Sequence, residues 1–238
     1  MYDGLSEFYD LFMQDVDYNA WCDFISHHIP TKGCGLDVGC GSGKLTLMLS
    51  QRGFNMSGVD LSPEMVAIAM KNARRNAITN VSFAVGNAEK INLSIPVDFI
   101  TATCDVVNYL KNPIDFFKNT YNNLKAGGVF VFDISSEYKL KKVLGNNVYT
   151  EEKDGVVYVW NNNLYRNRVD MFLSFFRRDE DGRYTRFDEE QTQYVHNEND
   201  IIVALKSVGF SSVEIFADFG ENLSKNSERI HFIAKKGK

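Results

Sequence analysis

Short apolar runs alternate with segments of helical periodicity between Gly35 and Asp133. Five of these runs predict strands, at residues 36–38, 55–59, 81–85, 97–103 and 129–134. Between them, apolar side chains recur at helical spacing, as at Met65, Ile68 and Ala69. The fifth run is almost wholly apolar, which is typical of a strand covered on both faces. The alternation predicts a doubly wound, Rossmann-like α/β sheet with mostly parallel strands.

Capping residues mark the boundaries of two predicted helices. Ser62 and Pro63 predict a helix start, because serine accepts a hydrogen bond from a free amide and proline suits the first turn. A second helix follows Asn112-Pro113, and Gly127-Gly128 are expected at its C-terminal cap. Parallel sheets of this kind bind ligands at the carboxyl ends of their strands. We therefore look for chemistry first in the loop that follows the first strand.

The pattern changes after Ser136, where two hairpin signals indicate antiparallel strands. Asp154-Gly155 and Asp181-Gly182 each separate two runs of β-forming residues. Helical periodicity returns at residues 201–208 and ends at Gly209, before two final strands at 213–216 and 230–234. We predict one domain made of residues 1–136 and 198–238. Residues 137–197 are predicted to be an inserted antiparallel β subdomain that serves as a lid or a dimer contact.

Length, composition and charge restrict the class of protein. The 238 residues suit one large domain, or one domain with an insertion, and 44% hydrophobic with 24% charged residues is typical of a globular chain. No apolar run approaches the roughly 18 residues of a membrane helix, and the first residues lack a signal-peptide pattern. We therefore expect a cytoplasmic protein. The net charge of −5 argues against strong non-specific binding to nucleic acid.

The four cysteines give no metal-binding pattern. Cys22, Cys34, Cys40 and Cys104 include no CxxC pair, and the four histidines form no zinc-binding pattern with them in the sequence. We predict no metal site. Reduced thiols are the default for a cytosolic protein.

The loop from Asp37 to Gly43 carries glycine at positions 39, 41 and 43, between a strand and a helix. Glycine permits positive φ and close approach of a ligand, and a helix N-terminus offers free amides. Asp60 ends the second strand, 21 residues after Gly39. A carboxylate there can accept hydrogen bonds from both ribose hydroxyls of an adenosine ligand.

Details of the loop disfavour a dinucleotide cofactor. NAD sites prefer G-x-G-x-x-G, whose third glycine would fall at position 44, where this chain has Lys44. Asp37 would repel a pyrophosphate, but it suits a ligand that carries ammonium and sulfonium charges. An NAD-dependent oxidoreductase remains an alternative that titration with NAD tests.

The sequence LDVGCGSGKL at residues 36–45 resembles motif I of class I S-adenosylmethionine-dependent methyltransferases. Four further segments resemble motifs of that family in the same order: Gly58–Ser62, Gly86–Ala88, Asp98–Asp105 and Leu124–Gly128. The late helix that ends in Gly209-Phe210 resembles the family as well. Asn87 departs from the acidic residue that is usual beside adenine, and Ala126 replaces the usual proline.

The resemblance implies a seven-stranded sheet whose last strand is antiparallel, and methyl transfer by in-line displacement. It also implies S-adenosyl-L-methionine as cofactor and a role for several residues in binding it. Asp37 would orient the methionine amino group, Gly39, Cys40 and Gly41 would carry the methionine portion, and Asp60 and Leu61 would hold ribose and adenine. The resemblance further places Asn87 and Ala88 at the adenine edge, and Cys104 and Asp105 near the methionine end. A packed, unreactive thiol is the favoured interpretation of Cys104.

The N-terminal segment is rich in tyrosine, and similar segments in this superfamily cover the cofactor. Tyr9, Tyr18 and Trp21 are therefore candidates for contact with the ligand, with Tyr9 and Trp21 included in the predicted cofactor site. The alternative is that these residues pack as a helix against the sheet.

The predicted acceptor is a small molecule methylated at N or O. The segment Cys104–Tyr109 lacks the N/D-P-P-Y/F motif of amino-methylating nucleic-acid enzymes, and Thr103 precedes Cys104 where C5-cytosine enzymes have proline. A tRNA methyltransferase and a non-catalytic cofactor-binding protein remain alternatives. Tyr109, His196 and Asp105 are conceivable bases, and none is assigned. The layout is similar to nucleotide-sugar N-methyltransferases, and the protein is expected to be a monomer or a homodimer.

Overall fold

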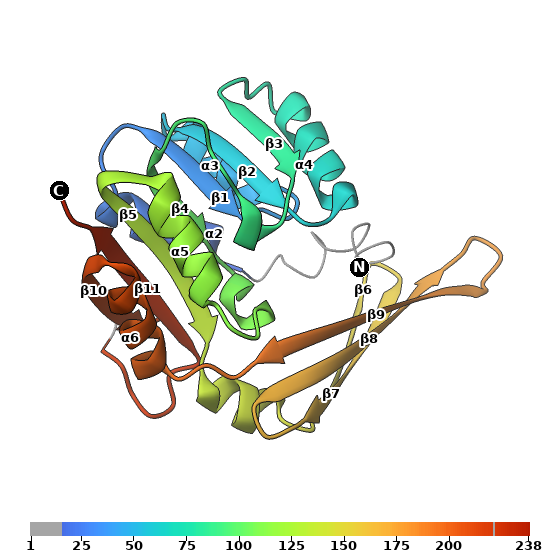
Figure 1. Ribbon diagram of the computed structural model, residues 1–238. Coiled ribbons are helices and arrows are strands. Elements are labelled where there is room, and N and C mark those ends of the chain that lie inside the picture. The colour runs from blue at the N-terminus through green and yellow to red at the C-terminus, as the bar shows by residue number, and fades with distance from the viewer. Residues whose placement is uncertain (1–15, 221) are drawn as a thin grey trace.

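The structure is a computed structural model that describes residues 16–220 and 222–238. Its larger sheet has seven strands in the order β10-β11-β5-β4-β1-β2-β3 (Figure 1). These strands are β1 (Cys34–Val38), β2 (Asn55–Asp60), β3 (Val81–Val85), β4 (Val97–Ala102), β5 (Leu124–Ser135), β10 (Phe210–Ala217) and β11 (Arg229–Lys236). β11 is antiparallel to β5 and to β10, whereas β1 to β5 pair in parallel. The predicted doubly wound sheet with its last strand antiparallel is confirmed.

Helices cover both faces of this sheet. They are α2 (Tyr18–His28), α3 (Lys44–Gln51), α4 (Pro63–Arg75), α5 (Ile114–Asn123) and α6 (Glu198–Val208). Apolar side chains of α2 and α3 pack with Phe99 and Val131 on one face, and those of α5 and α6 pack with Phe130 and Phe132 on the other. Because hydrophobic burial drives this packing, the sheet lies in the centre of the domain. No helix of the described residues is long and apolar enough to cross a membrane.

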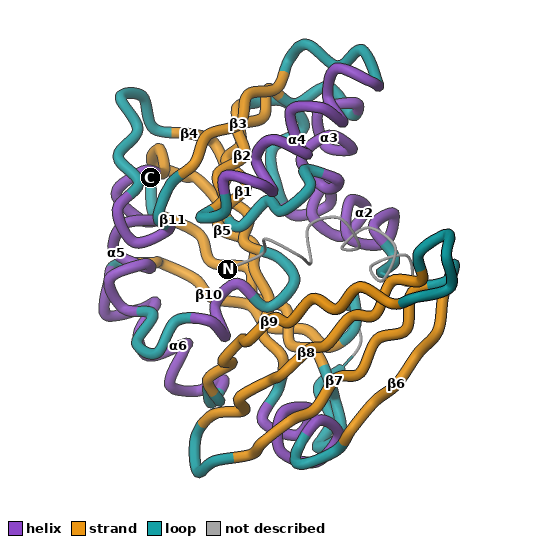
Figure 2. The backbone as a smooth tube through the Cα atoms, turned by 90° about the vertical axis from the view of Figure 1, so that its right-hand side faces the viewer, coloured by secondary structure: helices purple, strands orange, loops and turns teal. Residues whose placement is uncertain are grey.

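The second sheet contains four antiparallel strands in the order β6-β7-β8-β9. They are β6 (Val148–Lys153), β7 (Val156–Leu164), β8 (Arg168–Arg178) and β9 (Tyr184–Tyr194). The two predicted hairpins join β6 to β7 and β8 to β9, and a further turn at residues 165–167 joins β7 to β8. A π-helical segment, η3 (Lys139–Leu144), links it to β5. The sheet extends as an arm from the carboxyl end of β5, apart from the seven-stranded sheet (Figure 2). The predicted antiparallel insertion is thus observed, and its limits as a domain stay a prediction.

The boundary between α5 and β5 differs from the prediction. Helix α5 ends at Asn123, and Leu124 already has an extended conformation (φ −89°, ψ 141°). Gly127, with φ 74°, lies inside β5, where the register to β4 shifts between Phe99 and Val97. The two glycines therefore form an irregularity in a paired strand instead of a helix cap. Cross-strand pairing, which has no local sequence signal, decided this boundary.

The chain order of the strands creates a switch point between β1 and β4. The sheet grows in one direction through β2 and β3, and the chain then returns to place β4 on the other side of β1. Asp37 and Thr101 are register partners at this junction. Ligands of open α/β sheets bind in the crevice at such a point, so the fold directs attention to the loops after β1 and β4.

Candidate active site

The loop after β1 is held open by glycine and by backbone contacts to β2. Gly39, Gly41 and Gly43 all have positive φ, at 70°, 53° and 80°. The amides of Gly39 and Cys40 donate to the Val59 carbonyl at 2.8 and 3.1 Å. A Cβ on Gly39 would lie 2.4 Å from Val106 Cγ2, so this position excludes a side chain. The loop then enters α3 at Lys44, as predicted.

Asp37 lies at the base of the loop with only 2% of its surface exposed. Thr46 and Thr101 donate hydrogen bonds to its two carboxylate oxygens at 2.6 and 2.8 Å. Burial raises the pKa of Asp37 to about 6, and the two threonine hydrogen bonds only partly offset that effect. The buried carboxyl group therefore has a pKa only slightly below neutral pH, and it is mostly charged at pH 7.

A pocket opens above Asp37 at the switch point. Its wall combines the glycine loop, the start of α2 and the residues after β4. It is lined by Tyr18, Asp37, Gly39, Cys40, Ser42, Lys44, Leu45, Thr103 and Cys104. The Lys44 ammonium lies 4.4 Å from the centroid of the Tyr18 ring. The site thus combines a buried carboxylate, an exposed cation and an aromatic face.

Asp60 braces the glycine loop from the end of β2. Its Oδ2 accepts from the Gly41 amide at 2.8 Å, and its Oδ1 accepts from the Ser62 amide at 2.9 Å. Each carboxylate oxygen retains a further lone pair, which can accept a ribose hydroxyl. The next side chain, Leu61, is 59% exposed and offers an apolar surface beside this carboxylate.

The loop that contains Asn87 lies next to Asp60. The Gly86 amide donates to the Asp60 carbonyl at 2.9 Å. Asn87 caps a short 3-10 helix, η1 (Ala88–Lys90), by accepting from the Glu89 amide at 2.8 Å. Ala88 is half-buried against the core. The structure therefore brings Asp60 and Asn87, which are 27 positions apart, to the same edge of the sheet.

The two cysteines of the predicted site are protonated thiols. Burial raises the pKa of Cys40 well above the ordinary range, and it raises the pKa of Cys104 to about 11. A nucleophilic cysteine requires a lowered pKa. The favoured interpretation of Cys104 as a packed, unreactive thiol agrees with this environment.

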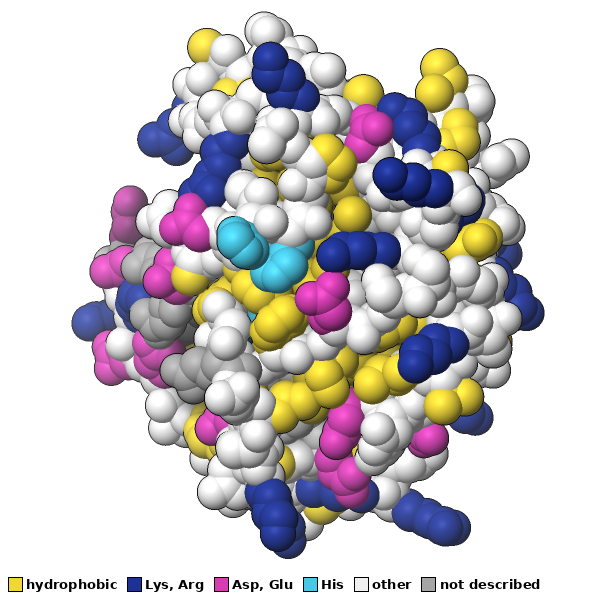
Figure 3. Space-filling view, turned by 90° about the vertical axis from the view of Figure 1, so that its left-hand side faces the viewer, with side chains coloured by type: hydrophobic (Ala, Val, Ile, Leu, Met, Phe, Trp, Pro, Cys, Tyr) yellow, Lys and Arg dark blue, Asp and Glu magenta, His cyan; other side chains and the backbone are white. Residues whose placement is uncertain are grey.

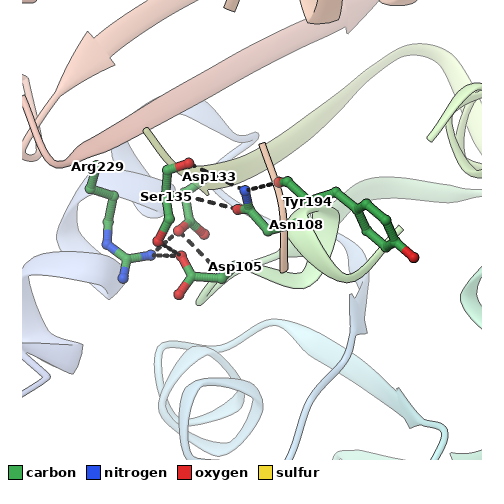
Figure 4. A network of polar contacts seen from close by, with 6 residues as sticks. All are labelled: Asp105, Asn108, Asp133, Ser135, Tyr194 and Arg229. Carbon is green, nitrogen blue, oxygen red and sulfur yellow. Dashed lines mark hydrogen bonds and ion pairs between the residues drawn. The ribbon is translucent and has the colours of Figure 1, made fainter. Parts of the chain in front are cut away.

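Asp105 turns away from the pocket into a polar network (Figure 4). Its Oδ1 accepts from Ser135 Oγ at 2.9 Å and from Arg229 Nη1 at 3.0 Å. Arg229 Nη1 also forms an ion pair with Asp133, whose side chain is fully buried. Burial would raise the pKa of Asp105, but the charges of Arg229 and Lys139 and the hydrogen bonds from Ser135 and Gln193 together outweigh it and hold the pKa below its ordinary value.

Trp21 does not line the pocket, although we predicted that it would bind the cofactor. Its side chain is 2% exposed and packs against the rings of His231 and Phe219, at centroid distances of 4.6 and 5.1 Å. Because hydrophobic burial favours packing of the apolar face of α2 against the sheet, Trp21 on that face lies in the core. Tyr18, one turn earlier, reaches the pocket instead. Tyr9 lies outside the described residues.

Several neighbours of the pocket were missed in the sequence. Thr46 and Thr101 complete the environment of Asp37, and Arg229 and Ser135 complete that of Asp105. Thr46 lies in the first turn of α3, Thr101 on β4, Ser135 at the end of β5 and Arg229 at the start of β11, so only the fold brings them to the same edge of the sheet. The resemblance marked the late part of the chain, but it assigned no role to Arg229.

The fold and the pocket together are typical of an α/β protein with a ligand site at the switch point of its sheet. A family model described as a methyltransferase domain matches residues 33–179. A relative from Geobacillus sp. (strain WCH70), provisionally named a methyltransferase, is 33% identical over 99% of this chain and 99% of its own length. This chain therefore belongs to the methyltransferase domain family.

Two solved structures extend this result. The structure of an S-adenosylmethionine-dependent methyltransferase from Clostridium acetobutylicum ATCC 824 matches with a TM-score of 0.89 and 35% identity, over 100% of this chain and 99% of that chain. A sugar N-methyltransferase from Streptoalloteichus sp ATCC 53650 matches with a TM-score of 0.80 and 21% identity, over 97% and 93% of the two chains, and shares the fold. The protein is an S-adenosylmethionine-dependent methyltransferase.

We expect replacement of Lys44 by methionine to weaken binding of S-adenosylhomocysteine about threefold. The ammonium lies at the pocket and would attract the carboxylate of the ligand, but its exposure to water keeps the effect small. Isothermal titration calorimetry at low salt measures the change. Lys71→Met, on the outer face of α4, is the matched control, and an equal effect of both variants would contradict a local role for Lys44.

Proposed function

We propose that this enzyme transfers the methyl group to a nitrogen or oxygen atom of a small molecule. The position of the four-stranded sheet carries the proposal. Asn108, just after β4, donates hydrogen bonds to the carbonyl oxygens of Ser135 and Tyr194, so it fastens both ends of the insertion beside Cys104 of the pocket. In this proposal the insertion lies over the Cys104 side of the pocket, and a small acceptor enters between the insertion and the pocket.

We propose that the cofactor lies along the loops after β1, β2 and β3. In this arrangement Asp37 and the loop from Gly39 to Gly41 hold the methionine portion, and Asp60 binds the ribose hydroxyls. Leu61 contacts adenine, whereas Asn87 and Ala88 lie at its edge. The free lone pairs of Asp60 and the exposed Leu61 side chain support this fit.

When bound, S-adenosylmethionine supplies an electrophilic methyl group, which an acceptor lone pair takes by in-line displacement while the sulfur retains the bonding electron pair. The chain contributes orientation, because holding two reactants in line removes much of the entropic barrier. An amine acceptor has to be neutral to react, whereas a hydroxyl would benefit from a base. His196 Nε2 contacts the Leu110 carbonyl at 2.9 Å, so this nitrogen is not free to take a proton from an acceptor in this conformation.

Charge and cysteine chemistry support a small-molecule enzyme of the cytoplasm. On the face shown in Figure 3, Lys and Arg side chains are scattered among Asp and Glu instead of forming one basic patch. A tRNA-binding surface needs clustered positive charge, which this one face does not offer and which the net charge of −5 does not favour. All four cysteines are unpaired, which suits a reducing compartment.

A transfer assay with tritiated S-adenosylmethionine tests the proposal. The enzyme is given either a metabolite extract freed of macromolecules or purified total tRNA, with Asp60→Ala protein as the control. We expect label in small products of the metabolite extract. Ribonuclease-sensitive label in the tRNA reaction alone would replace the proposal with a tRNA methyltransferase. Absence of label from both pools, with intact S-adenosylhomocysteine binding, would favour a non-catalytic binding protein.

A further inference from the structure

Two consecutive residues shortly after β4, neither of them glycine, have left-handed backbone conformations. Cys104 has φ 61° and Asp105 has φ 70°. Residues other than glycine pay an energetic cost in this region, and such conformations persist only where the surroundings enforce them. Because Cys104 lines the cofactor pocket, the conformation of this turn shapes the pocket wall.

Three hydrogen bonds that hold the turn come from residues of β5 and β11 (Figure 4). The Asp105 amide donates to Asp133 Oδ2 at 3.3 Å, and the Asp105 carboxylate accepts from Ser135 Oγ. Arg229 Nη1 joins the two carboxylates by bonding to Asp105 Oδ1 and Asp133 Oδ2. One guanidinium therefore fixes the turn to the end of β5.

The charges in this cluster make the guanidinium hard to replace. Asp133 is fully buried and the Asp105 side chain is 17% exposed, so both carboxylates are largely removed from water. Without a cation between them, two like charges would remain in a region of low dielectric. Lys139 also lowers the pKa of Asp105, but the structure gives it no direct bond to either carboxylate.

We propose that Arg229 is a positioning residue for the cofactor pocket, which it shapes by tying Asp105 to Asp133 and so holding Cys104 in its left-handed conformation. Arg229 is 124 residues from Asp105 in the sequence. Its own side chain does not line the pocket. The inference uses the established cofactor class, and it is independent of the proposed acceptor.

Replacement of Arg229 by methionine tests this role, because methionine retains much of the apolar stem and loses the cation. We expect the dissociation constant for S-adenosylhomocysteine to rise about fivefold by calorimetry. Lys235→Met is the matched control on the same strand. Its ion pair with Glu214, at 3.1 Å, lies on the surface, and the control should bind S-adenosylhomocysteine as the unchanged protein does.

A double-mutant cycle with Asp105→Asn separates positioning from direct contact with the ligand. If Arg229 acts through Asp105, the double variant binds S-adenosylhomocysteine no more weakly than Arg229→Met alone. Effects that multiply would show that Arg229 acts on the ligand independently, and they would overturn the proposal. Unchanged affinity in Arg229→Met would overturn it as well.

Unfolding by urea, measured on the same proteins, distinguishes a loss of pocket shape from a loss of folding. If Arg229→Met does not fold, Arg229→Lys is the variant to measure, because lysine retains the positive charge but lacks the planar set of N–H donors of the guanidinium. This variant should fold, and it should still weaken S-adenosylhomocysteine binding measurably; wild-type affinity would contradict the proposal. Failure of the unchanged protein to bind S-adenosylhomocysteine would instead contradict the cofactor assignment.

Discussion

Replacement of Asp60 by alanine should lower the affinity for S-adenosylhomocysteine about tenfold or more. The carboxylate has two tasks in the structure. It accepts from the Gly41 and Ser62 amides, and its remaining lone pairs are positioned for the ribose hydroxyls. Alanine removes the ribose contacts and also leaves two amides of the loop without their acceptor.

Calorimetric titration of matched variants separates these tasks. Asp60→Asn retains an oxygen acceptor but loses the charge, so its affinity should lie between those of the unchanged protein and Asp60→Ala. Asp115→Ala is the control, because this exposed aspartate only pairs with Lys118 on the surface of α5. Unchanged affinity in Asp60→Ala would refute the predicted ribose site, whereas the family membership would stand.

Replacement of Asp37 by asparagine should stabilise the fold at neutral pH and weaken cofactor binding. Burial raises the pKa of Asp37 to about 6 in the folded protein, from an ordinary value of 3.8. The charged form is therefore destabilising, by about 3 kcal/mol above pH 6. Asparagine removes that cost, and its amide can still form hydrogen bonds with Thr46 and Thr101.

The pH dependence has a definite sign. An acid whose pKa is higher in the folded than in the unfolded state binds more protons when folded between those two values. The free energy of unfolding contributed by Asp37 therefore falls as the pH rises from about 4 to about 6, and it is constant above that. In Asp37→Asn this fall should disappear.

Urea unfolding of both proteins from pH 4 to pH 8 measures the effect, with Asp98→Asn as a contrast. Burial would raise the pKa of Asp98, but hydrogen bonds from Lys125 and the Cys34 amide outweigh it and lower the pKa. Removal of that charge should therefore destabilise the protein at neutral pH. Equal stability of Asp37→Asn and the unchanged protein at pH 8 would show that the Asp37 charge is compensated in the folded protein.

If Asp37→Asn is more stable but binds S-adenosylhomocysteine more weakly, the Asp37 charge lowers the stability of the fold and serves ligand binding. A buried carboxylate without a cation close to it is unfavourable for folding. It becomes useful if a ligand brings positive charge to the adjoining pocket, as the ammonium and sulfonium groups of S-adenosylmethionine would in the proposed arrangement. The loop chemistry that disfavoured a pyrophosphate in the sequence is thus consistent with a specific energetic role for Asp37.

Local signals in the sequence predicted most of the sheet and the glycine loop that lines the pocket. Ser62 caps α4 by accepting from the Met65 amide at 3.2 Å, and both Asp-Gly pairs join adjacent strands. The glycine loop and Asp60 lie where the pattern indicated. Each of these features depends on residues that are close together in the chain, and short-range preferences therefore specify them.

Features that depend on distant partners could not be predicted in this way. Trp21 and Tyr18 lie on the same helix, and only the packing of α2 on the sheet determines that Trp21 enters the core while Tyr18 meets the pocket. Gly127 suited a helix cap in the sequence, but strand pairing placed it within β5.

The sequence by itself determined the doubly wound fold and the cofactor class, and it predicted the loops of the cofactor site, because periodicity and motif residues act over a few positions. Only the tertiary structure decided which side chains complete the site. The link from Arg229 to Asp105 joins residues 124 positions apart. Its ends are brought together by the pairing of β11 with β5 and of β5 with β4. Such contacts arise from the summed packing of the whole sheet, and no local pattern encodes them.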